Sequence, residues 1–196
     1  MRYTYDNSTN NVRNPNHPPK AVSYGPQSRD EMAELWIQLL PATGKDYELL
    51  TRALAAYKNQ KSMEADEHAL RKNPADAEAH AGLGLSLMDE NRPIEAEQHL
   101  RAAIAAQPDY APGHYNLGLL FRHQNKLAEA RAEFETALRL DPRHAKAHGN
   151  LGFIFLALAD LEAAQRHFES ALRLNPDDTI ARAGLTDTLR ALGRTP

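Results

Sequence analysis

The sequence predicts an all-α fold, in which antiparallel helix pairs form an array closed by a C-terminal capping helix. Proline recurs every 34 residues, at Pro74, Pro108, Pro142 and Pro176. Ala, Leu, Glu and Arg dominate from about residue 30 onward, and this mixture favours helix. Other residue types share the period: His80, His114 and His148; Leu83, Leu117 and Leu151; Gly84, Gly118 and Gly152; Ala96, Ala130 and Ala164; Ala103, Ala137 and Ala171; and the large apolar set Leu100, Phe134 and Phe168. Such a shared period indicates stacked repeats.

Composition narrows the class of protein. The chain has 196 residues, a net charge of -3 and no cysteine. The absence of cysteine excludes disulfides and thiolate metal sites, and the charge balance shows no overall footprint for nucleic acid. No apolar run approaches the length that spans a bilayer, and no signal peptide is evident at the N-terminus. As the sequence stands, we expect a cytoplasmic protein with no membrane span.

The first 42 residues differ from the rest. Residues 1–28 hold five Asn and four Pro and almost no aliphatic side chains, so they cannot bury enough surface to offset their ordering entropy. We expect an extended or partly disordered segment there. The stretch "EMAELWIQLL" that follows has apolar residues at helical spacing, and a helix and a strand both remain open for residues 30–40.

Residues 43–76 resemble the later repeats in a degenerate form. "YELLTRALAAYKN" predicts a first helix and "SMEADEHALRKNP" a second. Polar Asp66 takes the position of the large apolar residue in the later repeats. We therefore expect a degenerate helix pair here, whose second helix aligns with "PIEAEQHLRAAIAAQP" only by dropping about a turn.

Three full repeats follow, at 77–110, 111–144 and 145–178. In the middle one, "APGHYNLGLLFRHQ" and "KLAEARAEFETALRL" predict two helices. Asn125 between them is placed to end the first helix in a left-handed conformation, and the second helix stops ahead of Asp-Pro. Gly in mid-helix costs about 1 kcal/mol, so we expect a close helix approach, with Gly118 against Ala130.

The third repeat and the C-terminal end depart slightly from this pattern. Ala159 takes the place of the Gly or Asn expected at the turn, which makes that turn harder to predict. Residues 179–193 keep Leu185 and Leu189 but have no partner helix. They predict a cap that shields the last apolar face.

"HYNLGLLFRHQNKLAEARAEFETALRLDP" resembles the tetratricopeptide repeat (TPR) family, and the match covers residues 77–178. Its departures are His at the position that is usually Trp, and Leu87 and Leu100 in place of aromatic residues. The resemblance implies a right-handed superhelix whose concave side is lined by the first helix of each repeat and binds an extended peptide or a helix of a partner.

The resemblance also supplies candidate groove residues, which fall at matching positions of the first helices. They are Glu78, Leu85 and Met88 in the first repeat; Tyr115, Asn116, Leu119, Arg122 and His123 in the second; and Lys146, Asn150 and Phe153 in the third. Asn116 and Asn150 are the strongest candidates because an amide satisfies a backbone donor and acceptor together. Arg122 and Lys146 could meet a carboxylate. The first repeat lacks the basic residues of a terminal-carboxylate clamp.

The sequence gives weaker support for three other functions, namely metal binding, catalysis and nucleic-acid binding. Equivalent histidines on stacked helices lie too far apart to share one metal ion; His144 and His148 have suitable spacing but no third ligand. No nucleophile elbow, P-loop or paired-carboxylate motif is present, so we expect neither an enzyme nor a cofactor. Basic residues on the second helices alternate with acidic ones, which indicates a mixed surface rather than a nucleic-acid site.

The first 40 residues carry a second resemblance. "YTYDNSTNNVRNPNHPPKAVSYGPQSRDEM" is similar to the end of the C-terminal domain of bacterial copper type II, ascorbate-dependent monooxygenases. The resemblance implies that Met32 matches a thioether copper ligand, which suits copper(I), and that residues 3–5 and 21–24 are strand remnants. His17 and Met32 alone make no redox copper site, because the histidine-bearing strands of that family are missing.

Two functions follow from these patterns. The first is a protein-interaction scaffold that binds a peptide or helix of a partner protein. The alternative is an inactive C-terminal fragment or accessory tail of a copper monooxygenase-like protein, with copper only in a longer, extracytoplasmic parent. The DNA upstream of Met1 would distinguish them. The sequence names neither the partner nor the oligomeric state.

Overall fold

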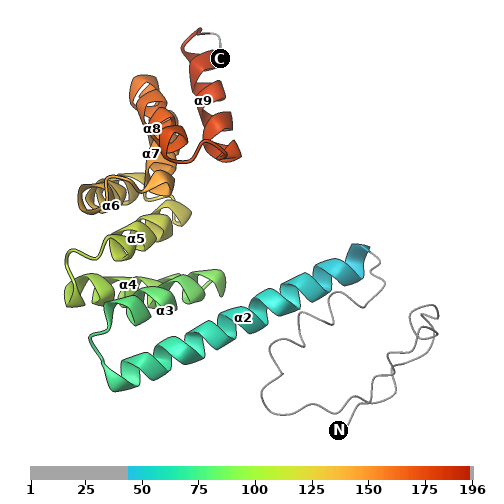
Figure 1. The fold of residues 1–196 in the computed structure, drawn as a ribbon, viewed down its shortest axis with the longest axis vertical. Helices are drawn as coiled ribbons and strands as arrows, with labels where there is room; N and C mark the ends of the chain where they lie inside the picture. Colours follow the sequence, from blue (N-terminus) through green and yellow to red (C-terminus); the bar gives the residue numbers. More distant parts are fainter. Residues whose placement is uncertain (1–43, 195–196) are drawn as a thin grey trace. The chain divides into compact units, whose positions relative to one another are not determined.

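A computed structural model describes residues 44–194 of the chain, which divides into two compact units, residues 1–58 and 59–196. The described residues contain eight helices and no strand (Figure 1). The helices are α2 (Gly44–Lys72), α3 (Ala77–Asp89), α4 (Pro93–Ala106), α5 (Ala111–His123), α6 (Leu127–Leu140), α7 (Ala145–Ala157), α8 (Leu161–Leu174) and α9 (Thr179–Ala191). The all-α prediction is confirmed. The predictions for residues 1–42, including Met32 and the strand remnants, lie outside the described residues.

The region expected to hold a degenerate helix pair is a single helix. α2 runs without interruption from Gly44 to Lys72, so the prediction of two helices in 43–76 is wrong. The reason lies in the turn position. The later turns place Asn91, Asn125 and Ala159 in the left-handed region, and the residue 34 positions before Asn91 is Tyr57. A bulky aromatic residue disfavours that conformation, so the helix continues.

The helices from α3 to α8 pack as successive pairs. α3 packs against α4, α5 against α6, and α7 against α8, and α9 packs on both α8 and α7. The second helix of one pair also contacts the first helix of the next, and first helices contact each other, α3 with α5 and α7 with α9 (Figure 1). This continuous stacking buries apolar faces that a single pair would leave in water.

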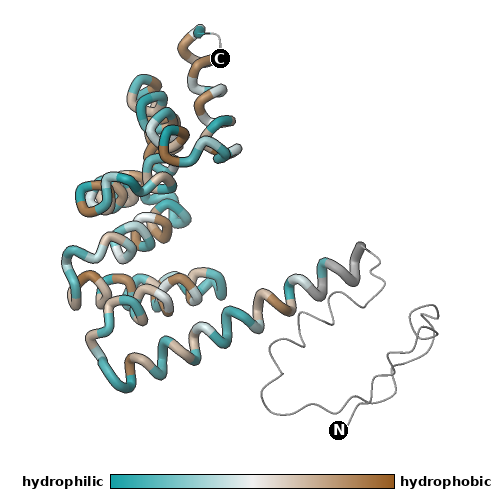
Figure 2. The backbone as a smooth tube through the Cα atoms, in the orientation of Figure 1, coloured by the Kyte–Doolittle hydropathy of each residue, from teal (hydrophilic) through white to brown (hydrophobic). Residues whose placement is uncertain are grey.

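The core is built from the repeated apolar positions. Leu100, Phe134 and Phe168 are each fully buried in the second helices. Burial of one such side chain stabilises the fold by about 2–3 kcal/mol. Small Ala residues around them, such as Ala130 and Ala164, are also fully buried. The helices accordingly carry hydrophobic and hydrophilic residues in alternation along the tube (Figure 2), which is the amphipathic pattern of surface helices.

The glycines of the first helices make room for these large core residues. A Cβ atom on Gly118 would lie 2.8 Å from the ring of Phe134, and one on Gly152 would lie 2.7 Å from the ring of Phe168. We had expected Gly118 to lie against Ala130, but its nearest neighbour is Phe134, so that prediction is wrong. The close approach is that of a glycine to an aromatic ring, because a phenylalanine side chain reaches further from its helix than the methyl group of alanine.

The turns explain why the helices end where they do. Asn91, Asn125 and Ala159 have φ near +59°, and the following amide bonds back to the preceding helix in each case. Asn125 is thus confirmed as a left-handed helix terminator. Ala159 forms the same turn although alanine gains nothing from it, which shows that the stacking of α7 on α8 holds the conformation.

Candidate functional site

The predicted groove residues lie on α3, α5 and α7, as the repeat pattern indicates. The structure brings two of them into direct contact: the Asn150 amide donates to the Tyr115 hydroxyl over 3.4 Å. Tyr115 lies on α5 and Asn150 on α7. The bond therefore joins the first helices of adjacent repeats on the face that the sequence predicts to be the groove.

Tyr115 is the centre of an aromatic and polar cluster. Its ring centroid lies 4.3 Å from that of His144 and 5.6 Å from that of Phe134. Burial raises the pKa of Tyr115, while the hydrogen bond from Asn150 and the charge of Arg122 act against that rise. The hydroxyl therefore stays protonated at neutral pH and can donate to a ligand while it accepts from Asn150.

Asn116 lies beside this cluster without an internal partner. Its side chain is only 6 % exposed, yet its amide makes no hydrogen bond to any residue of the described chain. Neither amide atom is among the fully enclosed unpaired atoms of that part of the chain, so both still reach solvent. An amide that is nearly buried but open at its polar end is suited to pairing with a peptide backbone.

His144 supports the cluster at the start of α7. Its Nδ1 accepts a hydrogen bond from the Ala147 amide over 3.1 Å and so caps the helix. Burial lowers the pKa of His144, and the cap requires an unprotonated Nδ1. The ring is consequently neutral at pH 7 and positions Tyr115 by contact rather than by charge.

The remaining groove candidates differ in exposure. Arg122, His123 and Lys146 are exposed, and neither Arg122 nor Lys146 forms an ion pair within residues 44–194. Leu119, Phe153 and Met88 are half-buried and pack against the core, whereas Leu85 is 39 % exposed and Glu78 is exposed. The structure therefore joins Tyr115 with Asn150 and places the cations nearby, but the assignment of all these residues to partner binding stays a prediction.

The structure gives other contacts to the histidines that were considered as metal ligands. His144 caps its helix, and His148 Nδ1 faces His167 Nδ1 at 3.2 Å. No group of three or more His, Asp or Glu side chains within residues 44–194 is arranged to hold a metal ion. The copper prediction for Met32 concerns a residue outside the described part.

Sequence reasoning missed a row of contacts between the two helices of each repeat. His80, His114 and His148 face His99, Glu133 and His167 respectively. The signal was present in the sequence, since these three partners also recur every 34 residues. The period is hard to recognise at this position, because the three repeats carry His, Glu and His there.

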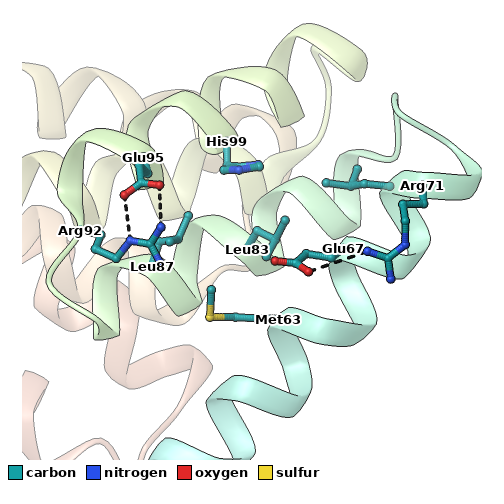
Figure 3. Close-up of a pocket in the computed structure, with 9 residues that line it drawn as sticks. Met63, Glu67, Arg71, Leu83, Leu87, Arg92, Glu95 and His99 are labelled. Atoms are coloured by element: carbon teal, nitrogen blue, oxygen red, sulfur yellow. Dashed lines mark hydrogen bonds and ion pairs between the residues drawn. The ribbon is translucent and has the colours of Figure 1, made fainter.

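A cavity of about 440 Å³ lies between α2, α3 and α4, and its lining includes none of the predicted groove residues (Figure 3). Met63, Leu83 and Leu87 form its apolar part. Two ion pairs stand at its rim, Glu67 with Arg71 and Glu95 with Arg92. The rim charges are thus paired with each other, and the cavity marks loose packing of α2 rather than a charged site.

Two family models match the chain, and both describe a tetratricopeptide repeat. One matches residues 111–144 and 145–178, and the other matches residues 50–111. Together the matches extend from residue 50 to residue 178, which is more than half of the chain. The chain therefore belongs to the tetratricopeptide repeat family, and the resemblance seen in its sequence is confirmed.

Solved structures agree with this assignment. PilF of Pseudomonas aeruginosa is 27 % identical, with a TM-score of 0.65 over 85 % of this chain and 72 % of its own. MamA is 19 % identical, with a TM-score of 0.61 over 75 % of this chain and 84 % of its own. The first TPR domain of Spaghetti (RPAP3), solved with an HSP90 peptide, is 24 % identical, with a TM-score of 0.58 over 60 % of this chain and 94 % of its own.

Two further findings bear on the class of protein. No curated protein matches the sequence. Among the described helices, none combines the length and the apolarity that a bilayer span requires.

Proposed function

We propose that this chain is a protein-interaction scaffold that binds an extended peptide or a helix of a partner on the face formed by α3, α5 and α7. The observation that carries the proposal is the Asn116 amide, which is nearly buried, makes no internal hydrogen bond and still reaches solvent. Because this amide has no internal partner to give up, a ligand that pairs with it does not have to break a hydrogen bond within the chain.

The charged residues around Asn116 indicate what kind of partner segment would bind. Arg122 and Lys146 are exposed cations without an ion pair in the described part of the chain. A carboxylate on the partner would form charge-assisted hydrogen bonds with them. On α3 the exposed charges are instead Glu78 and Asp89. A bound segment would therefore place its acidic residue near α5 and α7 and not near α3.

The relatives by fold lend support. The two TPR domains of RPAP3 were solved with the HSP90 peptide SRMEEVD and the HSP70 peptide SGPTIEEVD. Both peptides end in the sequence EEVD, in which three of the four residues are acidic. Because α3 of the present chain carries acidic charge, we expect it to select peptides with internal acidic residues over those that depend on a terminal carboxylate.

A displayed library of random 12-residue peptides tests the proposal. Selected peptides would be measured by fluorescence polarisation against the native chain, Asn116→Ala and the control Gln98→Ala, which alters an exposed amide on α4. We expect Asn116→Ala to weaken binding about tenfold, as for the loss of one buried hydrogen bond, with unchanged unfolding. Equal affinities for Asn116→Ala and Gln98→Ala would overturn the groove assignment.

A further inference from the structure

The first helix of each repeat is tied to the second by one histidine contact, and the three contacts are not alike. His80 Nδ1 lies 3.0 Å from His99 Nδ1, and His148 Nδ1 lies 3.2 Å from His167 Nδ1. In the middle repeat, His114 Nδ1 lies 2.7 Å from a carboxylate oxygen of Glu133. The first and third repeats thus use two rings where the middle repeat uses a ring and an acid.

The two His–His contacts are the same arrangement repeated. The ring centroids are 5.2 Å apart with an interplanar angle of 41° in the first pair, and 5.3 Å apart with an angle of 40° in the second. Such agreement between separate repeats shows that the geometry is built by the helix pair and is not an accident of one side chain.

The neighbouring carbonyl groups determine where the protons lie. His80 Nε2 is 3.1 Å from the Pro74 carbonyl oxygen, which only accepts, so Nε2 carries a proton. In a neutral ring Nδ1 then has a lone pair, and His99 Nδ1–H must donate to it. A backbone hydrogen bond of Pro142 favours the protonated form of His148, and the His148–His167 contact repeats the geometry of the first pair. Each His–His pair therefore has one proton between the two facing nitrogens.

The middle repeat holds its protons differently. His114 Nε2 lies 3.2 Å from the Pro108 carbonyl, and its Nδ1 faces the Glu133 carboxylate. Both partners are acceptors, so this ring can carry two protons and keep both hydrogen bonds. Added protons strengthen this contact as a charge-assisted bond, whereas a pair of doubly protonated rings would place two N–H donors and two like charges against each other.

We propose that the His80–His99 and His148–His167 pairs make this scaffold proton-responsive, so that acidification loosens the first and third helix pairs while the middle pair holds. In the folded state each His–His pair accepts at most one further proton without losing its hydrogen bond. In the unfolded chain both histidines bind protons freely below a pKa of about 6.5. The unfolded chain therefore binds more protons than the folded chain, and stability falls as pH falls.

The surroundings of His99 and His148 also disfavour the charged form of each ring. His99 faces Glu67 on α2 and Glu95 on its own helix, yet burial and the His80 ring still lower its pKa. His148 lies near His144 and Arg173, and burial lowers its pKa.

His167 is the most strongly affected member. Burial, His148 and Arg166 lower the pKa of His167 to about 4, with Arg131 adding to this and only Glu135 of α6 opposing it. Phe155 stacks on this ring at 5.2 Å and excludes water from one face. Since the folded pKa of His167 is about 4 and the unfolded value about 6.5, its contribution is complete above about pH 6.5 and is lost as pH falls toward 4.

The middle repeat supplies the test variant. Replacing His99→Glu and His167→Glu gives every repeat the His–Glu contact that His114 already makes. Urea unfolding of the full chain, followed by circular dichroism between about pH 5 and pH 7, measures proton uptake on unfolding. We expect the double variant to take up about two fewer protons than the native chain, one for each altered pair.

The reverse substitution tests the same proposal independently, in case the double variant does not fold. Glu133→His adds a third His–His pair and should steepen the pH dependence by about one proton. The other titrating groups, including His144 and Asp66, are the same in all three chains and cancel. Nitrogen NMR of the native imidazoles should also show His80 protonated at Nε2 and His99 at Nδ1. Equal pH slopes in the three chains, or the opposite tautomers, would overturn the proposal.

Discussion

The junction between α2 and α3 and the junction between α8 and α9 share one geometry and differ in chemistry. In both, a residue of one helix meets a glycine of the helix that follows it: Asp66 meets Gly82, and Phe168 meets Gly184. Phe168 is fully buried, and its ring also packs on Gly152. Asp66 instead places Oδ2 in a buried position without a hydrogen-bond partner in the described chain.

The difference shows what the repeated position requires. An aromatic ring fills the space between two glycine backbones and gains burial on both sides, whereas a carboxylate loses hydration there without compensation. The cavity between α2, α3 and α4 lies at the same poorly filled junction. The N-terminal junction is thus the weak point of the described array, and α9 closes the C-terminal end with a fully packed contact.

The largest expected effect comes from giving the C-terminal junction the N-terminal chemistry. Phe168→Asp removes a fully buried ring and introduces a carboxylate, so we expect a loss of about 4 kcal/mol or more in the free energy of unfolding. Urea denaturation measures it. Phe168→Leu is the control, because Leu100 occupies the equivalent position, and should lose about 1–2 kcal/mol. Equal losses in the two variants would contradict the comparison.

Alanine substitutions of the two junction glycines, Gly184 and Gly82, should change the stability by different amounts. Gly184→Ala places a Cβ atom 2.5 Å from the fully buried Phe168 ring, and we expect it to destabilise by about 1–3 kcal/mol. Gly82→Ala meets only the end of the Asp66 side chain, which can rotate away, and it gains about 1 kcal/mol of helix propensity. Thermal unfolding of both variants checks the order. A Gly82→Ala loss as large as that of Gly184→Ala would show that α2 is as rigidly packed as α8.

Giving the N-terminal junction an apolar residue should stabilise the chain. Asp66→Leu removes the unpaired carboxylate and restores the residue type of Leu100, which we expect to add about 1–2 kcal/mol. Burial raises the pKa of Asp66, with Glu78 and Asp76 adding to the rise. Its folded pKa lies above its unfolded pKa, so protonated Asp66 favours folding at low pH and this contribution is lost as pH rises through the folded pKa.

The stability difference between Asp66→Leu and the native chain should consequently widen as pH rises from about 4 to about 7. Urea unfolding at several pH values measures that difference. Asp76→Asn serves as a matched control, since it removes one of the charges that raise the Asp66 pKa and keeps an N-cap residue. A difference that stays constant with pH would mean that the Asp66 carboxyl is hydrated.

The smallest expected effect concerns the turn before α8. A more stable turn there would increase the difference in stability between the C-terminal and the N-terminal junction. Ala159 has a φ of 59°, the same region as Asn91 and Asn125. Asparagine tolerates this conformation better than alanine, so Ala159→Asn should stabilise by about 0.5–1 kcal/mol. Differential scanning calorimetry would register a small rise in Tm. An unchanged or lower Tm would show that the turn carries no strain.

The candidate site was predictable in part. The resemblance placed Tyr115, Asn116 and Asn150 on the first helices, and the structure finds them there. It could not show that Asn150 is engaged by Tyr115 while Asn116 is not. The partner position lies 35 residues earlier, where Tyr115 offers Asn150 a hydroxyl and Ala81 offers Asn116 none, so the distinction becomes visible only once the contact between adjacent first helices is known.

The turns were predictable for a different reason. Asn125 ends its helix as expected because the left-handed preference of asparagine is local. The Gly118 contact was placed on the wrong neighbour because reach across a helix pair depends on side-chain length and helix separation, which a sequence period does not report.

The sequence by itself determined the repeat, the helix pairs from residue 77 onward and the turns between them, because period, proline placement and helix-ending residues act over a few neighbouring positions. Only the tertiary structure decided that His80 meets His99 and that Asp66 lacks a partner. These outcomes arise from contacts between separate helices, and the free energy of such contacts depends on which surfaces meet after the chain has folded.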